Sequence, residues 1–279
     1  MSQLGKFHYV VTGPERGPKL VFLHGVMGFA ANWRRIAKAF EDRFQVLVFD
    51  QRGHGRSFHA PPGGYQPSSY AADLLRILDE LGWQEVYLVG HSMGGRVALE
   101  FAAQHPQRVT RLVIEDIGPT MQESGSSLIL RLLDTVPVPF SSKREAKAWF
   151  DTEFMRIFAN ERQKEGLAAY LYANLIENEN KEAGWRFSDA GVRESVAAGR
   201  AGDHWEVVRH LPMPTLFVRG EFSRDFPREV FQQVLRENPR IEGVEILGAG
   251  HWVHSDQPEI FIRVLTQFLA GQRQPLVAG

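Results

Sequence analysis

The stretch Gly90-His91-Ser92-Met93-Gly94 sets a serine between two glycines. The apolar run 86–89 before it predicts a strand, and the periodic run 96–102 after it predicts a helix. A serine on a sharp strand-to-helix turn has its hydroxyl pushed out where a base and a substrate can reach it. The free N–H groups at the start of a helix also suit a developing oxyanion. The pattern therefore indicates that Ser92 is a nucleophile.

A serine hydroxyl needs a base to take its proton, and His251 is the strongest candidate among the ten histidines. It lies in Gly-Ala-Gly-His-Trp, just after the last predicted strand, 244–247. A glycine-rich loop in this place can carry an imidazole back over the sheet. His254, three residues later, is expected to be a helix-entry or surface residue.

The base in turn needs a carboxylate that holds its tautomer, and two aspartates qualify. Asp116 follows the predicted strand 109–114, and Asp225 follows the predicted strand 215–218. Both stand at carboxyl ends of strands, where the catalytic groups of open α/β sheets collect. The residues alone leave both aspartates open.

An oxyanion hole is expected beside the serine. The segment 24–28, His-Gly-Val-Met-Gly, follows the predicted strand 20–23, and its glycines allow a backbone N–H to face a reacting carbonyl. We assign that role to the N–H of Val26, together with the N–H of Met93. A phosphate-binding loop would require a Gly-Lys-Ser/Thr continuation, which is absent here. The glycine-rich run 50–57 is expected to be structural.

Strand and helix patterns alternate in residues 1–117 and again in 212–279, which predicts an α/β fold with a parallel sheet covered on both faces. Between them, residues 118–211 show helical patterns and no convincing strand, so we expect an inserted helical cap. The tail from Gly271 is expected to fray. The other segments expected in the core are strand 44–49 and helices 30–40, 69–81, 94–104, 228–236 and 259–269.

The predicted cap has helical patterns over 142–158, 161–175 and 189–198, and it is rich in large apolar residues. Most of these are expected to form the cap's own core, and a few to face a cleft and line an acyl pocket. They are Phe140, Trp149, Phe150, Phe154, Phe158, Tyr170, Tyr172, Trp185 and Phe187.

The composition excludes several classes of function. The chain has 279 residues, is 43% hydrophobic and carries a net charge of −1, so nothing suggests binding to nucleic acid or to an anionic membrane. It has no cysteine, which excludes disulfides, thiolate metal sites and cysteine nucleophiles. No apolar run is long enough to span a membrane, and residues 1–11 lack a secretion-signal pattern. We expect a cytoplasmic protein, with no metal and no organic cofactor.

Four motifs occur in the order of the α/β-hydrolase superfamily: His24-Gly25, the run 50–57, Gly90–Gly95 and Gly250-His251. The chain resembles this superfamily from about residue 7 to about residue 270, and it resembles most its serine carboxylesterase-like branch. The resemblance implies a mostly parallel, twisted sheet of eight strands flanked by helices, with the cap inserted after the sixth strand. It also implies a Ser-Asp-His triad in that chain order.

The resemblance bears on the choice of acid. Most of the family places the acid about three residues after the glycine equivalent to Gly220, where this chain has Ser223. Some branches place it after the preceding strand, in a pattern like Glu-Asp-Ile-Gly-Pro at 115–119. The resemblance therefore favours Asp116 and keeps Asp225 as the alternative.

These observations predict a serine hydrolase that cleaves small-molecule carboxylic esters with small to medium acyl chains. Other triad reactions remain open, namely those of a thioesterase, a lactonase or a carbon–carbon bond hydrolase. A ligand sensor without turnover on the same fold is a further alternative. The sequence leaves the oligomeric state open.

Overall fold

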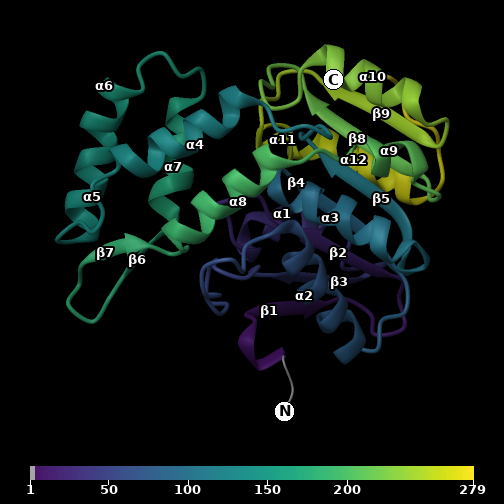
Figure 1. Cartoon of the computed structure of the whole chain (residues 1–279), viewed down its shortest axis with the longest axis horizontal. Coiled ribbons are helices and arrows are strands. Elements are labelled where there is room, and N and C mark those ends of the chain that lie inside the picture. The colour runs from purple at the N-terminus through teal and green to yellow at the C-terminus, as the bar shows by residue number, and fades with distance from the viewer. Residues whose placement is uncertain (1–3) are drawn as a thin grey trace.

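The computed structural model describes residues 4–279 and arranges them around one eight-stranded sheet (Figure 1). The strand order is β1-β3-β2-β4-β5-β8-β9-β10, and within the described residues only β1 runs antiparallel to its neighbour in this sheet. The expected mostly parallel sheet is confirmed. Its strands are β1 (Tyr9–Thr12), β2 (Lys19–Leu23), β3 (Gln45–Phe49), β4 (Val86–His91), β5 (Val109–Glu115), β8 (Thr215–Gly220), β9 (Ile241–Ile246) and β10 (Val277–Ala278).

Helices cover both faces of this sheet because its strands are apolar on both sides. Val21 and Leu23 pack in one core with α2, α3, α9 and α10, whereas Leu20 and Phe22 pack in a second core with α1, α11 and α12. This alternation follows from the two-residue period of a strand. The helices are α1 (Arg34–Lys38), α2 (Pro67–Glu80), α3 (Met93–Gln104), α9 (Trp205–His210), α10 (Arg228–Glu237), α11 (Val253–Asp256) and α12 (Pro258–Leu269).

The two ends of the sheet differ from the expectations. The tail does not fray throughout, because β10 pairs in parallel with β9 and the N–H of Glu245 donates to the carbonyl of Leu276 at 2.8 Å. Only β1 precedes β2 in the described chain, so the chain leaves the sheet after its fifth strand, not its sixth. A two-residue strand such as β10 is too short to show the alternation by which strands are recognised.

Between β5 and β8 the chain forms a separate group of elements beside the sheet, from which α8 leads back to the core (Figure 1). This group has its own apolar core, to which Phe140, Phe150, Phe154 and Phe158 contribute. A two-stranded antiparallel hairpin lies within it, contrary to the expectation of no strand. The elements are α4 (Glu123–Thr135), α5 (Lys143–Trp149), α6 (Met155–Ile157), α7 (Lys164–Ala173), β6 (Leu175–Glu177), β7 (Ala183–Trp185) and α8 (Asp189–Ala201).

Two further details refine the expected cap. The single helix expected over 142–158 is instead α5, a π-helical turn (Phe150–Phe154) and α6. Helix α9 was expected in the cap, but its Val208 packs in the core of the sheet with α10, so the cap's own core ends before it. None of the helices within residues 4–279 combines the length and the apolar content needed to cross a membrane.

Candidate active site

Ser92 stands at the sharp turn between β4 and α3. Its backbone has φ 53° and ψ −118°, which is a strained conformation for a residue with a side chain. A methyl group added at Gly90 would lie 2.3 Å from the carbonyl oxygen of Gly94, and one added at Gly94 would lie 2.4 Å from the carbonyl oxygen of Leu23. Close packing therefore requires both glycines, and the turn they allow aims Ser92 at the end of the sheet.

Asp116 directly follows β5 and makes the shortest contact to the expected base. Its Oδ2 lies 2.8 Å from Nδ1 of His251 and also accepts a hydrogen bond from the Ser223 hydroxyl at 2.6 Å. Its Oδ1 accepts from the N–H of Gly220 at 2.8 Å. The carboxylate is fully buried, and these donors hold it in one orientation. Asp116 can thus fix the proton of His251 on Nδ1 and leave Nε2 free as a base.

Asp225 also reaches His251, so that the imidazole lies between two carboxylates. Its Oδ2 is 3.5 Å from Nδ1 of His251, and its side chain is 24% exposed. Ser223 takes the place where most of the family has its acid, and it donates to Asp116 instead. The contacts favour Asp116 over Asp225 as the orienting group.

The charges around His251 bear on its protonation. Burial acts to lower the pKa of His251, but the negative charges of Asp225 and Asp116 outweigh it and raise that pKa above the ordinary 6.5. Burial also raises the pKa of Asp116, while its hydrogen bonds with His251 and Ser223 act in the opposite direction. An imidazolium formed during a reaction would therefore be stabilised here.

The backbone N–H groups of Val26 and Met93 are free donors near Ser92. Within residues 4–279, neither N–H donates to another group. Val26 lines the same cavity as Ser92, and Met93 is the first residue of α3. A methyl group added at Gly25 would lie 3.2 Å from Cβ of Ser92, so the loop after β2 passes close to the serine because it has no side chain there.

Two buried histidines hold that loop. The N–H of Met27 donates to Nε2 of His54 at 3.2 Å, and the N–H of Gln51 donates to Nε2 of His24 at 3.0 Å. Burial lowers the pKa of His24 to about 4 and that of His54 to about 3, so both rings are neutral acceptors at neutral pH. The run 50–57 is structural, as predicted: Arg52, for example, pairs with buried Asp73 at 2.6 Å.

A cavity that is open to solvent lies in front of Ser92 and His251. Both side chains line it, although within residues 4–279 no hydrogen bond joins them. One wall is apolar and comes mainly from α4, which the sequence analysis did not single out. The remaining lining residues are Val26, Met27, His91, Ser124, Gly125, Leu128, Ile129, Leu132, Glu161, Arg162, Gln163, Leu167, Phe222, Arg224, Asp225 and Trp252.

At the rim of this cavity, three consecutive residues of the cap contact the core. Helical periodicity shows which residues share one face, but it does not show what that face meets. Sequence reasoning therefore missed these contacts. They are the ion pair of Glu161 with Arg224 at 3.6 Å, the guanidinium of Arg162 at 3.5 Å from the ring centre of Phe222, and the hydrogen bond from Gln163 to Asp256 at 2.8 Å.

Two expectations about the site hold only in part. None of the nine aromatic residues named for the cap lines the cavity: all nine belong to or pack against the cap's own core, and the Tyr170 hydroxyl also donates to the carbonyl of Val26 at 3.0 Å. His254 is a helix residue but is not at the surface: it is 5% exposed, and its Nδ1 lies 2.8 Å from Glu115. Glu115 is the last residue of β5 and lies 139 positions before His254 in the sequence, so no local pattern reveals this contact.

Comparison with known proteins agrees with this fold. The family model described as "alpha/beta hydrolase fold" matches residues 18–258. The chain belongs to the α/β-hydrolase family. This α/β hydrolase is 33% identical to the mouse (Mus musculus) sn-1-specific diacylglycerol lipase ABHD11, over 94% of its own length and 84% of that protein. It is 30% identical to a putative esterase/lipase of Haemophilus influenzae, over 90% of its own length and 83% of that protein.

Among solved structures, a marine microorganism esterase superposes on this α/β hydrolase with a TM-score of 0.80 at 28% identity. The match covers 94% of this chain and 99% of the esterase. The chain is therefore a hydrolase-fold enzyme with esterase and lipase relatives.

Proposed function

We propose that this α/β hydrolase cleaves carboxylic esters through an acyl-enzyme on Ser92. The observation that carries the proposal is that His251 pairs with buried Asp116 at 2.8 Å and lines the same cavity as Ser92. This arrangement provides a nucleophile, a base and an orienting carboxylate in the chain order expected for the fold. The printed names of the mouse and Haemophilus relatives, a lipase and an esterase/lipase, support ester substrates.

In the proposed reaction, Oγ of Ser92 attacks the acyl carbon while Nε2 of His251 takes the hydroxyl proton. Asp116 keeps the other imidazole proton on Nδ1 and stabilises the cation that forms. The N–H groups of Val26 and Met93 donate to the oxyanion. His251 then gives its proton to the leaving alcohol, and a water molecule, activated by the same imidazole, cleaves the acyl-enzyme. Nucleophile–base hydrogen bonds are often long in ligand-free enzymes and tighten when substrate binds.

The cavity suggests where the acyl chain lies. Leu128, Ile129 and Leu132 of α4 form an apolar wall, and Leu167 of α7 adds to it. A wall of this kind suits a small to medium hydrocarbon chain, because burying each methylene is worth about 0.8 kcal/mol. We infer that residues from α4 to α8 act as a cap that shapes this acyl pocket.

The test compares hydrolysis of p-nitrophenyl acetate, butyrate and octanoate by the wild type and by Ser92→Ala. The wild type should hydrolyse at least one of these esters far faster than the variant does. A fluorophosphonate probe should label the wild type and not the variant. Equal rates for both proteins on every ester would refute the proposal, and labelling without turnover would identify a ligand sensor instead.

A further inference from the structure

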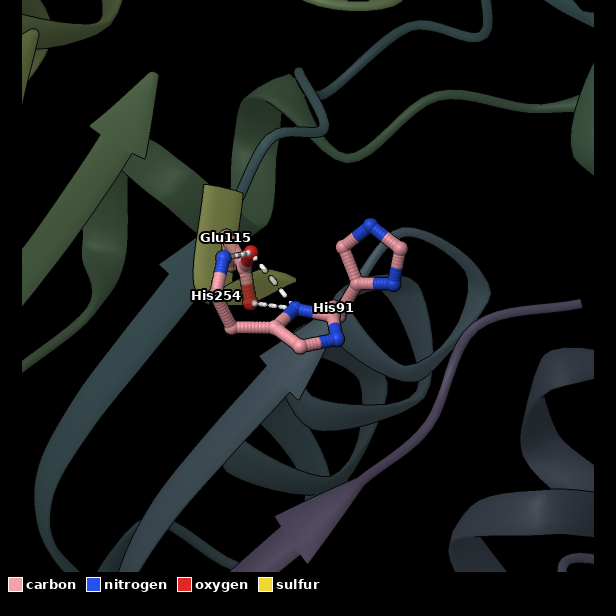
Figure 2. A group of neighbouring side chains, drawn as sticks. All are labelled: His91, Glu115 and His254. Carbon is pink, nitrogen blue, oxygen red and sulfur yellow. Dashed lines mark hydrogen bonds and ion pairs between the residues drawn. The ribbon is translucent and has the colours of Figure 1, made fainter. Parts of the chain in front are cut away.

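Beside the catalytic groups lies a second group of three polar side chains, His91, Glu115 and His254, here named the buried clamp (Figure 2). Of the three, His91 also lines the cavity. All three are at most 5% exposed. His91 comes directly before the proposed nucleophile, and Glu115 directly before the proposed acid. His254 comes three residues after the proposed base. The clamp therefore has one member next to each of the three groups that must meet.

Glu115 and His254 are tightly joined. The Glu115 carboxylate oxygens lie 2.8 and 3.0 Å from Nδ1 of His254, and Oε1 also accepts from the N–H of His254 at 2.8 Å (Figure 2). The ring of Trp33 stacks on His254 with 4.4 Å between ring centres. These contacts attach the first turn after the His251 loop to the end of β5.

His91 holds the His251 loop from the other side. Its Nε2 lies 2.9 Å from the carbonyl oxygen of His251. Burial holds the pKa of His91 well below its ordinary value, so the ring is neutral. Because a carbonyl only accepts, Nε2 must carry the proton. The ring of His91 also packs closely against Gly25 in the loop after β2, since a methyl group added there would lie 2.7 Å from Nδ1 of His91. This close packing limits how far the ring can turn toward Gly25.

We propose, on the basis of the proposed function, that the buried clamp positions the imidazole of His251 for proton transfer. Through His91 and Glu115, the loop that carries His251 is hydrogen-bonded to the ends of β4 and β5, which also carry the nucleophile and the acid. Buried polar groups that lose a partner are costly, so these contacts fix the loop at one distance from both strands. The clamp residues act through the placement of His251 and are therefore positioning residues.

The clamp also has the residue types of a metal site, and its possible ligand atoms lie within 4.8 Å of one another. The hydrogen bonds favour positioning instead. Nε2 of His91 and Nδ1 of His254 each carry a proton that is donated to an oxygen, and a nitrogen that bears a proton cannot bind a metal.

The test uses His254→Phe, which keeps a ring on Trp33 but removes the side-chain donor to Glu115 and leaves only the backbone N–H, and His254→Gln, whose side-chain amide can still donate. His254→Phe should lower kcat on a p-nitrophenyl ester about 100-fold. KM should stay unchanged, because His254 does not line the cavity. His254→Gln should recover most of the loss. Hydrogen exchange over residues 248–256 should rise in His254→Phe whether or not the ester is a substrate.

Asp73→Asn is the matched control, because Asp73 is 2% exposed and pairs with Arg52 at 2.6 Å, outside the cavity lining. It should lower the melting temperature without changing kcat or exchange over 248–256. The clamp proposal is overturned if His254→Phe keeps wild-type exchange there, if Asp73→Asn loses as much kcat, or if dialysis against EDTA abolishes wild-type activity. Failure of the proposed function is distinct, because it shows as equal rates for the wild type and Ser92→Ala.

Discussion

Asp225→Asn gives the sharpest test of how the charges around His251 are divided. The amide keeps the shape of the side chain and removes the charge that lies 3.5 Å from Nδ1 of His251. Asp116 keeps its own hydrogen bond to that nitrogen, so orientation should survive. We expect the variant to remain an active hydrolase with an altered pH profile.

The size of the change follows from the distance. Two unit charges this close interact by at least about 1 kcal/mol even at the dielectric constant of water. One pH unit corresponds to about 1.4 kcal/mol, so the pKa of His251 should fall by about 0.7 unit or more. His251 must be neutral to accept a proton, so the acid limb of the kcat/KM profile reports the pKa of His251. This pKa is raised, and the acid limb of the wild type is therefore expected above pH 6.5. Removing Asp225 should therefore move this limb to lower pH.

The assay is the pH dependence of kcat/KM for a p-nitrophenyl ester with the wild type, Asp225→Asn and Asp116→Asn. Glu161→Gln is the control, because it removes another carboxylate of the same cavity that pairs with Arg224 and not with His251. Its acid limb should stay in place. Asp116→Asn should lower kcat by about 10⁴-fold through loss of the correct tautomer.

Two results would refute this reasoning. An acid limb in Asp225→Asn that coincides with the wild type would mean that this carboxylate has no influence on His251. A loss of kcat in Asp225→Asn as large as that expected for Asp116→Asn would reverse the assignment and make Asp225 the orienting acid.

Three other predictions test the cavity and the loop beneath it. Gly125→Val should lower kcat/KM about tenfold, because a Cβ at this position would lie 1.6 Å from Oδ1 of Asp225. Gly166→Val, where a Cβ meets nothing within 4 Å, should not. Ile129→Trp should lower kcat/KM for octanoate relative to acetate about tenfold, and an unchanged ratio would place the acyl chain elsewhere. Since burial lowers the pKa of His24 to about 4 and that of His54 to about 3, the unfolded state binds more protons than the folded state below about pH 6.5. The free energy of unfolding should therefore fall by about 1.4 kcal/mol per pH unit for each histidine between about pH 6 and pH 4, and a urea midpoint that is flat over this range would contradict it.

The features that the sequence predicted correctly depend on local steric requirements. The turn at Ser92 could be predicted because it requires glycine at positions 90 and 94, where neighbouring backbone atoms leave no room for a side chain. Asp116 and Asp225 could both be proposed as the acid, a role that stays a prediction, because each follows an apolar strand whose carboxyl end lies at the edge where the site forms. The parallel sheet could be predicted for a similar reason, since strands buried on both faces are apolar throughout.

The features that the sequence did not predict depend on partners far along the chain or on very short elements. The burial of His254 depends on Glu115, and the wall of the cavity depends on which face of α4 meets the core. The hairpin β6–β7 and the strand β10 have two or three residues each, too few to show a period. Most aromatic residues of the cap form its core as expected, because large apolar side chains pack in a core more often than they line a pocket, and the expectation that a few line the cavity is wrong.

The rim of the cavity combines three interactions that respond differently to solution conditions. Salt screens the exposed ion pair of Glu161 with Arg224, whereas it has much less effect on the hydrogen bond of Gln163 and on the stacking of Arg162 over Phe222. Higher ionic strength should therefore weaken the first of these contacts, while the other two keep the cap attached to the core. Bulky esters should gain access as salt rises, while small ones that already pass freely should be unaffected, and rates for a short and a branched ester measured across a salt series would reveal that difference.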